Sequence, residues 1–302
     1  MESLLKSIIK TSFENKSFSI ALFHNVSDIK PKDLFLFVHG FPDSHETWSH
    51  QVEYFKSKAY VAAFDLRGTS DSHGPRSQKG YSIEEVLKDF DLVINYLKKQ
   101  NPKIKKIHLV GHDWGAILGW AYISDKTRVG KIGSYTAMGG IHSGHIIKEN
   151  LLKLISFNPS KLFQALDQFS HSWYVYFFQL PFFPEASLTV FNNYIFKKAL
   201  AMAQLPKSDP MWRWRSAKID KAGSNAIKLY RQLVRNPPQL PDQLIEVPVC
   251  QYIFKQDAFV RPASFENQQD LCKNYQVAYF DCNHWGHRSH FGLINEQLEK
   301  LL

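Results

Sequence analysis

Short apolar runs alternate with amphipathic stretches along the first part of the chain. "DLFLFVHG" (33–40) and "YVAAFDLRG" (60–68) are β-rich runs that end in glycine, a pattern typical of buried strands. Between them, Trp48, Val52 and Phe55 recur at helical spacing. The pattern predicts a strand, a helix and a second strand in succession.

The alternation continues toward residue 140. Residues 82–99 have helical periodicity, and Ser82 with Glu85 at the start of this stretch fits a capping box. "KIHLVGHDWG" (106–115) predicts a third strand that runs into a turn, and "AILGWAYISD" (116–125) predicts the helix after it. Residues 131–140 predict a fourth strand. Because strands and helices alternate, we expect a mostly parallel sheet flanked by helices, the α/β class.

The regular pattern stops after about Gly140 and resumes near residue 245. Residues 141–244 are rich in aromatic side chains, contain eight prolines and read mostly as helix. Two further strands are expected within 245–257 and 275–285, and a terminal helix within 291–302. We therefore predict an α/β core made of 1–140 and 245–302, with residues 141–244 inserted as a helical cap, or lid.

The length and charge exclude some classes of function. The chain has 302 residues, which suits one large α/β domain that carries an insertion. Its formal net charge is +9, but the lysines are scattered, and no zinc-finger or RNA-recognition motif occurs. This favours a solvated, lysine-rich surface over a functional basic patch, and we expect no nucleic-acid partner.

Cysteine usage and the start of the chain bear on the compartment. The three cysteines, Cys250, Cys272 and Cys282, form no C-x-x-C pair, which is typical of reduced thiols. The N-terminal stretch is interrupted by lysines, so it does not resemble a signal peptide, and no run is long enough to span a membrane. We expect a cytoplasmic protein without an integral membrane segment. Its oligomeric state is left open.

The turn after the third predicted strand contains the sequence "GHDWG" (111–115). Its spacing is that of a nucleophile elbow, in which small residues flank a nucleophile on a sharp strand-to-helix turn. Gly111 and Gly115 meet that need, and the centre holds Asp113 in place of the more common Ser. The alternative is an ordinary strand–helix turn with Asp113 as a helix cap.

A carboxylate nucleophile predicts a two-step reaction. Asp113 needs no base to activate it and can attack an sp3 carbon of an epoxide or an alkyl halide, which gives an ester. A neutral histidine can then activate a water molecule that attacks the ester carbonyl. The resulting oxyanion needs backbone N–H donors. One is expected from Trp114, the residue after the nucleophile, and the other from Phe41 in the loop "HGFP" (39–42).

The partners of the nucleophile are expected after later strands, in the order nucleophile, acid, histidine. Asp257 in "FKQDAF" and His284 in "CNHWGHRSH" follow the last two predicted strands, where a parallel sheet presents its active-site loops. Asp257 would orient the imidazole of His284 and stabilise its cation. His287 and His290 are rivals for this role, but they lie a turn further along and we expect them at the surface or in a cap.

Together these motifs resemble the epoxide hydrolases of the α/β-hydrolase fold over nearly the whole chain. "HGFPDSHETWSHQ", "AAFDLRGTSDS", "GHDWG" and "NHW" resemble their core motifs, although Asn283 stands where glycine is usual. "YFFQLPFFPE" (176–185) and "NAIKLYRQL" (225–233) resemble their cap. The resemblance implies a small apolar epoxide as substrate, a diol as product, and no metal or organic cofactor, and no metal-ligand spacing is found in the sequence.

In that family two cap tyrosines bind the epoxide oxygen and donate a proton as the ring opens. Tyr230 matches one of them. The position of the second is occupied by Phe177, and Tyr176, one residue earlier, is our candidate, although one residue turns a helix by about 100°. The residues expected to contact substrate are Trp114, Phe41, Phe177, Phe178 and Trp173.

Other functions stay open. A haloalkane or haloacid dehalogenase would use the same aspartate nucleophile and the same His-Asp pair. The indole of Trp114 could hold the halide, but Phe41 stands where a second donor to the halide is typical. A serine esterase is disfavoured because the elbow has no serine. A homologue that binds a ligand without catalysis is the alternative from a different class.

Overall fold

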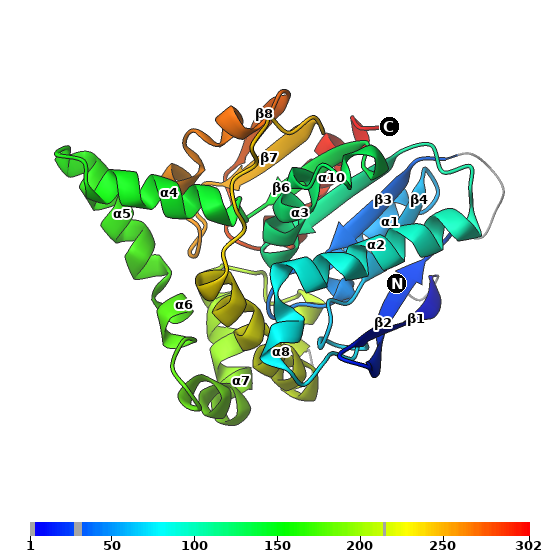
Figure 1. Ribbon diagram of the computed structural model, residues 1–302, viewed down its shortest axis with the longest axis horizontal. Helices are drawn as coiled ribbons and strands as arrows, with labels where there is room; N and C mark the ends of the chain where they lie inside the picture. The colour runs from blue at the N-terminus through cyan, green and yellow to red at the C-terminus, as the bar shows by residue number, and fades with distance from the viewer. Residues whose placement is uncertain (1–3, 27–31, 214–215) are drawn as a thin grey trace.

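The computed structural model describes residues 4–26, 32–213 and 216–302, and an eight-stranded sheet forms its centre (Figure 1). The strands are β1 (Leu5–Phe13), β2 (Lys16–His24), β3 (Leu34–Val38), β4 (Tyr60–Phe64), β5 (Ile107–His112), β6 (Ser134–Met138), β7 (Val249–Phe254) and β8 (Tyr275–Phe280). Their order is β1-β2-β4-β3-β5-β6-β7-β8. Only β2 pairs antiparallel, with β1 and β4, and the other neighbours are parallel. The predicted α/β class with a mostly parallel sheet is confirmed.

Helices cover both faces of this sheet. They are α1 (Ser49–Phe55), α2 (Ile83–Gln100), α3 (Trp114–Ser124), α4 (Ser143–Leu154), α5 (Pro159–His171), α6 (Trp173–Phe177), α7 (Phe183–Met202), α8 (Ser216–Arg235), α9 (Gly286–Ser289) and α10 (Phe291–Glu299). Short 3-10 turns are η1 (His45–Trp48), η2 (Gln78–Tyr81), η3 (Val129–Lys131), η4 (Pro210–Arg213), η5 (Pro262–Phe265) and η6 (Gln268–Leu271). The buried side chains of α2 and α3 pack on one face, with Leu36, and those of α1 and α10 pack on the other, with Phe37.

Local sequence explains why these elements begin where they do. The hydroxyl of Ser82 accepts a hydrogen bond from the amide of Glu85 at 3.4 Å, so the predicted cap of α2 is present. β3 and β4 are buried along their whole length, which accounts for their continuous apolar runs.

The N-terminal hairpin of β1 and β2 is not part of the sequence prediction. β1 is an edge strand whose polar side chains are largely exposed, so its sequence lacks the apolar run used to recognise the inner strands. The two strands are joined at Glu14 and Asn15, which have φ of 48° and 59°. Such a two-residue turn is usually marked by glycine, and none stands here.

Helices α4–α8 lie between β6 and β7 in the chain and fall within the segment predicted as a cap. Figure 1 shows them beside the sheet, with α4 and α5 extending outward and α6 to α8 below the ends of the central strands. The division into core and cap stays a prediction. Among the described residues, no helix is both long and apolar enough to cross a membrane.

Candidate active site

Asp113 stands at the turn between β5 and α3, in a backbone conformation that few residues adopt. Its φ is 51°, and a non-glycine residue with positive φ is held there only by its surroundings. A Cβ atom on Gly111 would collide with the backbone of Gly115, and one on Gly115 would collide with the carbonyl of Val38. The predicted need for two small residues around Asp113 therefore has a steric basis.

Backbone amides face the carboxylate of Asp113 from two sides. The N–H of Phe41, in the loop after β3, donates to Oδ1 at 2.7 Å. The amide of Trp114, at the start of α3, also faces the carboxylate and lowers its pKa. These are the two donors expected from the sequence. An oxygen at the position of Oδ1 is held by the N–H of Phe41, which need not reorganise when charge develops on that oxygen.

His284 and Asp257 come from the loops after β8 and β7, at the same edge of the sheet as Asp113. Asp257 Oδ2 lies 2.9 Å from Nδ1 of His284, and its Oδ1 accepts from the amides of Phe259 at 2.7 Å and Val260 at 3.1 Å. Nε2 of His284 is 3.7 Å from Oδ2 of Asp113. The structure thus brings the three predicted residues together. The imidazole points one nitrogen at each carboxylate.

Burial and charge shift the pKa values of this group in opposite directions. Burial raises the pKa of Asp113 above its usual value, and the nearby imidazole and the two amides offset part of that rise. Burial alone would lower the pKa of His284, but Asp257 first and Asp113 after it raise the pKa to about 9. At neutral pH His284 is therefore an imidazolium in the resting site.

Asp113 and His284 open onto a cavity of about 400 Å³ whose exposed lining is almost all apolar. The loops after β3, β7 and β8 contribute Phe41, Ala258 and Trp285 to it. Residues of α5 to α8 form the other side. A small apolar molecule could thus lie against the carboxylate while most of its surface is out of water.

Two tyrosines approach Asp113 from the inserted helices. Tyr230 of α8 is buried, packs edge-on to the indole of Trp114 with ring centroids 4.8 Å apart, and lines the cavity. Tyr174 of α6 lines it too, and its hydroxyl interacts with that of Tyr230. Burial and then neighbouring groups, among them Asp113, raise the pKa of both phenols. Both tyrosines therefore remain protonated at neutral pH and can donate.

Tyr176 is not at the site, contrary to our expectation. Its side chain is 50% exposed, packs against Phe169 and is absent from the cavity lining. The reason is helical geometry, because residues three and four apart share a face of a helix. Tyr174 shares its face with Phe177 and Phe178, which line the cavity, and Tyr176 points elsewhere.

The predicted substrate contacts are divided between the cavity and its surroundings. Phe41, Phe177, Phe178 and Trp173 line the cavity, although Trp173 is largely exposed at its edge. The side chain of Trp114 is buried behind Tyr230 and is not part of the lining, so its indole contacts the site through that tyrosine, while its backbone amide faces Asp113.

Asn283 is a further residue of the site that sequence reasoning passed over. Its Oδ1 accepts from the amides of His284 at 2.8 Å and Ala258 at 3.2 Å, and its Nδ2 donates to the carbonyl of Met202. One side chain thus links the histidine loop, the Asp257 loop and the end of α7. The only sequence signal was an asparagine where glycine is usual.

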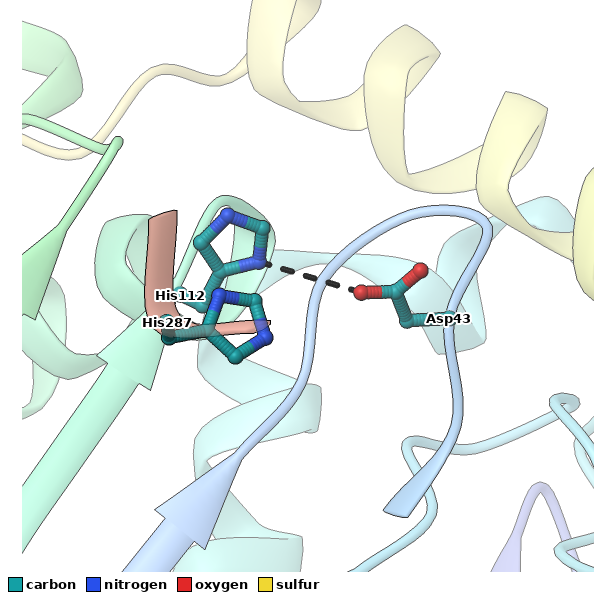
Figure 2. A group of neighbouring side chains, drawn as sticks. All are labelled: Asp43, His112 and His287. Carbon is teal, nitrogen blue, oxygen red and sulfur yellow. Dashed lines mark ion pairs between the residues drawn. The ribbon is translucent and has the colours of Figure 1, made fainter. Parts of the chain in front are cut away.

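Three buried side chains, Asp43, His112 and His287, lie close together (Figure 2). Asp43, His112 and His287 each direct one ligand-type atom into a space less than 4.8 Å across, and His112 Nδ1 is 3.8 Å from Asp43 Oδ2. Nε2 of His112 donates to the carbonyl of His284 at 2.9 Å. The spacing could suit a metal ion, but none of the three lines the cavity, and of the three it is His112 that holds the backbone of His284.

The two other histidines of this loop lie apart from Asp113. His287, expected at the surface or in a cap, is fully buried and its Nε2 is 2.9 Å from the hydroxyl of Thr47. Burial drives its pKa well below the usual value. His290 is exposed and precedes α10. His284 is the histidine that reaches Asp113.

Comparison with known proteins places this fold and site in a family. A family model described as alpha/beta hydrolase fold matches residues 33–291. The chain belongs to this family and is a hydrolase of the α/β-hydrolase fold, as the sequence motifs implied.

Individual relatives give more detail. "Epoxide hydrolase 2" of Caenorhabditis elegans is 25% identical over 288 residues, which cover 89% of this chain and 74% of that protein. "Probable oxidoreductase EphD" of Mycobacterium tuberculosis is 24% identical over 253 residues, or 82% of this chain but only 41% of that protein. A crystal structure of an epoxide hydrolase from Bacillus megaterium with an inhibitor superposes with a TM-score of 0.73 at 20% identity, over 94% of this chain and 96% of that one. At that identity the structural likeness shows the fold alone.

Proposed function

We propose that this chain opens an apolar epoxide to a vicinal diol. The observation that supports this most is the convergence of a carboxylate, Asp113, with the phenols of Tyr174 and Tyr230 in one apolar cavity. An epoxide needs a nucleophile at carbon and an acid at oxygen at the same time, because an unprotonated alkoxide is a poor leaving group. The name of the Caenorhabditis elegans relative agrees with this activity. On this view α4–α8 act as the cap.

In the first step, Asp113 attacks a ring carbon and the carbon–oxygen bond of the ring breaks. A proton from Tyr174 or Tyr230 passes to the ring oxygen, so the product is an ester of Asp113 that carries a free hydroxyl group. The amide of Phe41 orients the nucleophile at 2.7 Å. Attack is favoured because this hydrogen bond holds the carboxylate in place before the substrate enters.

In the second step, ester formation itself prepares His284 as a base. The negative charge of Asp113 is part of what raises the pKa of His284 to about 9, and the ester removes that charge. The pKa of His284 then falls, so the imidazolium gives its proton to the tyrosinate left by the first step. The neutral imidazole takes a proton from water as the water attacks the ester carbonyl, and the amides of Phe41 and Trp114 hold the oxyanion. The bond between the carbonyl carbon of Asp113 and the diol oxygen then breaks. The diol oxygen takes the proton of the new carboxyl group, which restores ionised Asp113 beside protonated His284.

A test of the mechanism is to trap the ester. In His284→Gln, ester formation should proceed and its hydrolysis should stop. After mixing with a panel of apolar epoxides and haloalkanes, the intact mass should rise by that of a whole epoxide, and peptide mapping should locate the adduct on Asp113.

The same measurement separates the alternatives. A rise equal to a haloalkane without its halogen would make the chain a dehalogenase, for which the relevant observation is the buried indole N–H of Trp114 beside the hydroxyl of Tyr230. If no adduct forms and the wild type turns over neither class, a non-catalytic binding role would replace the proposal.

A further inference from the structure

Most of the large hydrophobic side chains that are exposed among the described residues lie between Ile147 and Met202. Six of them, on α4, α5 and the segment that joins these helices, form what we call the apolar face: Ile147, Leu151, Ile155, Phe157, Phe163 and Leu166. Phe157 is fully exposed. Apolar surface of this extent is unusual on a protein that meets only water, and it marks a binding surface.

The residues of the apolar face recur at helical spacing, as on helices that present one side to a partner. Ile147 and Leu151 are four residues apart on α4, and Ile155 follows four residues later, so the three project from one side. Phe163 and Leu166 are three apart on α5, which packs against α4. Figure 1 shows α4 and α5 projecting from the sheet at one edge of the molecule, continued by α6 and α7.

The acidic side chains of α4 to α7 are all engaged within the protein. Glu149 accepts a hydrogen bond from Asn267 at 3.0 Å. Asp167 pairs with Arg261 at 2.8 Å, and Glu185 pairs with Arg231. Glu149 is also buried, so none of these carboxylates offers an exposed, unpaired negative charge to a partner.

The exposed positive charges of the same helices lack ion-pair partners among the described residues. They are Lys148, Lys161, Lys197 and Lys198. Helices that combine exposed apolar side chains with exposed lysines outside ion pairs suit the interface of an anionic lipid bilayer. A second copy of this chain would bring the same lysines to the contact, and like charges would oppose it.

The mouth of the cavity lies in the same stretch of the chain. Trp173, Tyr194 and Met202 are each more than half exposed, and each also lines the cavity that contains Asp113. Ile195 does so as well at 40% exposure. An apolar compound dissolved at a bilayer surface would meet these side chains before it reached the carboxylate.

We propose that α4 to α7 dock on the surface of an anionic lipid bilayer, and that the cavity takes its apolar substrate from that surface. The docking rests on the apolar face and the unpaired lysines. The substrate class, an epoxide that partitions into lipid, rests in addition on the function proposed above. The protein then lies on the membrane without crossing it, and the mouth of the cavity faces the lipid.

Vesicle flotation of the full chain tests the docking. Wild type should float with vesicles of phosphatidylcholine and phosphatidylserine, float less with phosphatidylcholine alone, and be released by salt because screening weakens the lysine contacts. The variant Ile155→Ser with Phe157→Ser and Phe163→Ser should bind at least about tenfold less, since three apolar anchors are lost. A matched control is Val277→Ser with Tyr279→Ser, two exposed side chains of β8 outside the apolar face, which should float as wild type does.

Hydrolysis of a small water-soluble epoxide, measured without vesicles, separates the two proposals. Wild type that hydrolyses this epoxide but stays off every vesicle would overturn the docking and leave the proposed function standing. Flotation without hydrolysis of either a soluble or a vesicle-borne epoxide would overturn the proposed function and leave the docking standing. If wild type stays off vesicles and sediments as a dimer that the triple serine variant dissociates, the apolar face joins two copies and the docking proposal is wrong.

Discussion

Tyr174 and Tyr176 stand two residues apart but differ in what they reach. Tyr174→Phe should lower the kcat for epoxide opening by about 10²-fold, because it removes a proton donor beside Asp113. Tyr230→Phe should have an effect of similar size. Tyr176→Phe, the matched control on the far side of α6, should stay within about twofold of wild type. Steady-state rates on one epoxide, with circular dichroism to confirm folding, provide the measurement.

The opposite result would favour Tyr176, the residue expected from sequence, as the proton donor. A large loss in Tyr176→Phe together with wild-type activity in Tyr174→Phe would mean that α6 turns its other side to the substrate. It would also remove the main support for the proposed ring-opening step.

The pKa values of the site predict different pH profiles for the two steps. Ester formation needs ionised Asp113, so its rate should fall as the pH drops through the raised pKa of that carboxyl group. Ester hydrolysis needs neutral His284, so its rate should rise with pH. Its midpoint should lie below 9, the pKa of His284 in the resting site, because the ester has removed one negative charge. Single-turnover kinetics across the pH range separate the steps, and a hydrolysis midpoint at or above 9 would contradict this account.

Sequence predicted the residues whose identity follows from local geometry. Gly111, Asp113 and Gly115 form a motif of five residues, and Asp257 and His284 directly follow strands. Tyr174 was missed because its recognition depends on which side of a short helix faces the cavity, and a motif match shifted by one residue hides that.

Two glycines, Gly115 in α3 and Gly292 in α10, should differ in how much their replacement by alanine changes stability. Gly115→Ala should destabilise the protein by about 2 kcal/mol or more, because the new methyl group meets the carbonyl of Val38 on β3 and forces α3 away from the sheet. Gly292→Ala is the control, since nothing lies within 4 Å of a Cβ there and α10 should gain about 0.5–1 kcal/mol. Chemical denaturation of both variants measures the difference. Equal stability of the two variants would mean that the strand-to-helix turn is not sterically tight.

Elements with a continuous apolar run or a clear cap were predictable, and edge elements were not. β3, β4 and β5 are buried throughout, and α2 has both its cap and its apolar stripe. One side of β1 is exposed to solvent, and β1 pairs only with β2. Its structure therefore depends on pairing with its neighbour rather than on a local apolar pattern.

At the scale of the whole molecule, sequence indicated an interrupted α/β chain but not how the insertion meets the sheet. The alternation of strands and helices, and its pause between about 141 and 244, agree with the positions of β6 and β7. Which side chains of α4 to α8 would line a cavity and which would be exposed depends on packing between distant segments. The net charge of +9 likewise did not reveal that unpaired lysines accompany an exposed apolar face.

The central claim is that the carboxylate of Asp113, rather than water, attacks the substrate. It is tested most directly by a single turnover with enzyme in excess over epoxide in water enriched in 18O. The account predicts a first diol that contains only 16O, with one oxygen from the epoxide and one from Asp113, and 18O in the peptide that carries Asp113. A first diol labelled with 18O, with no label in that peptide, would mean that water attacks directly and would contradict the account.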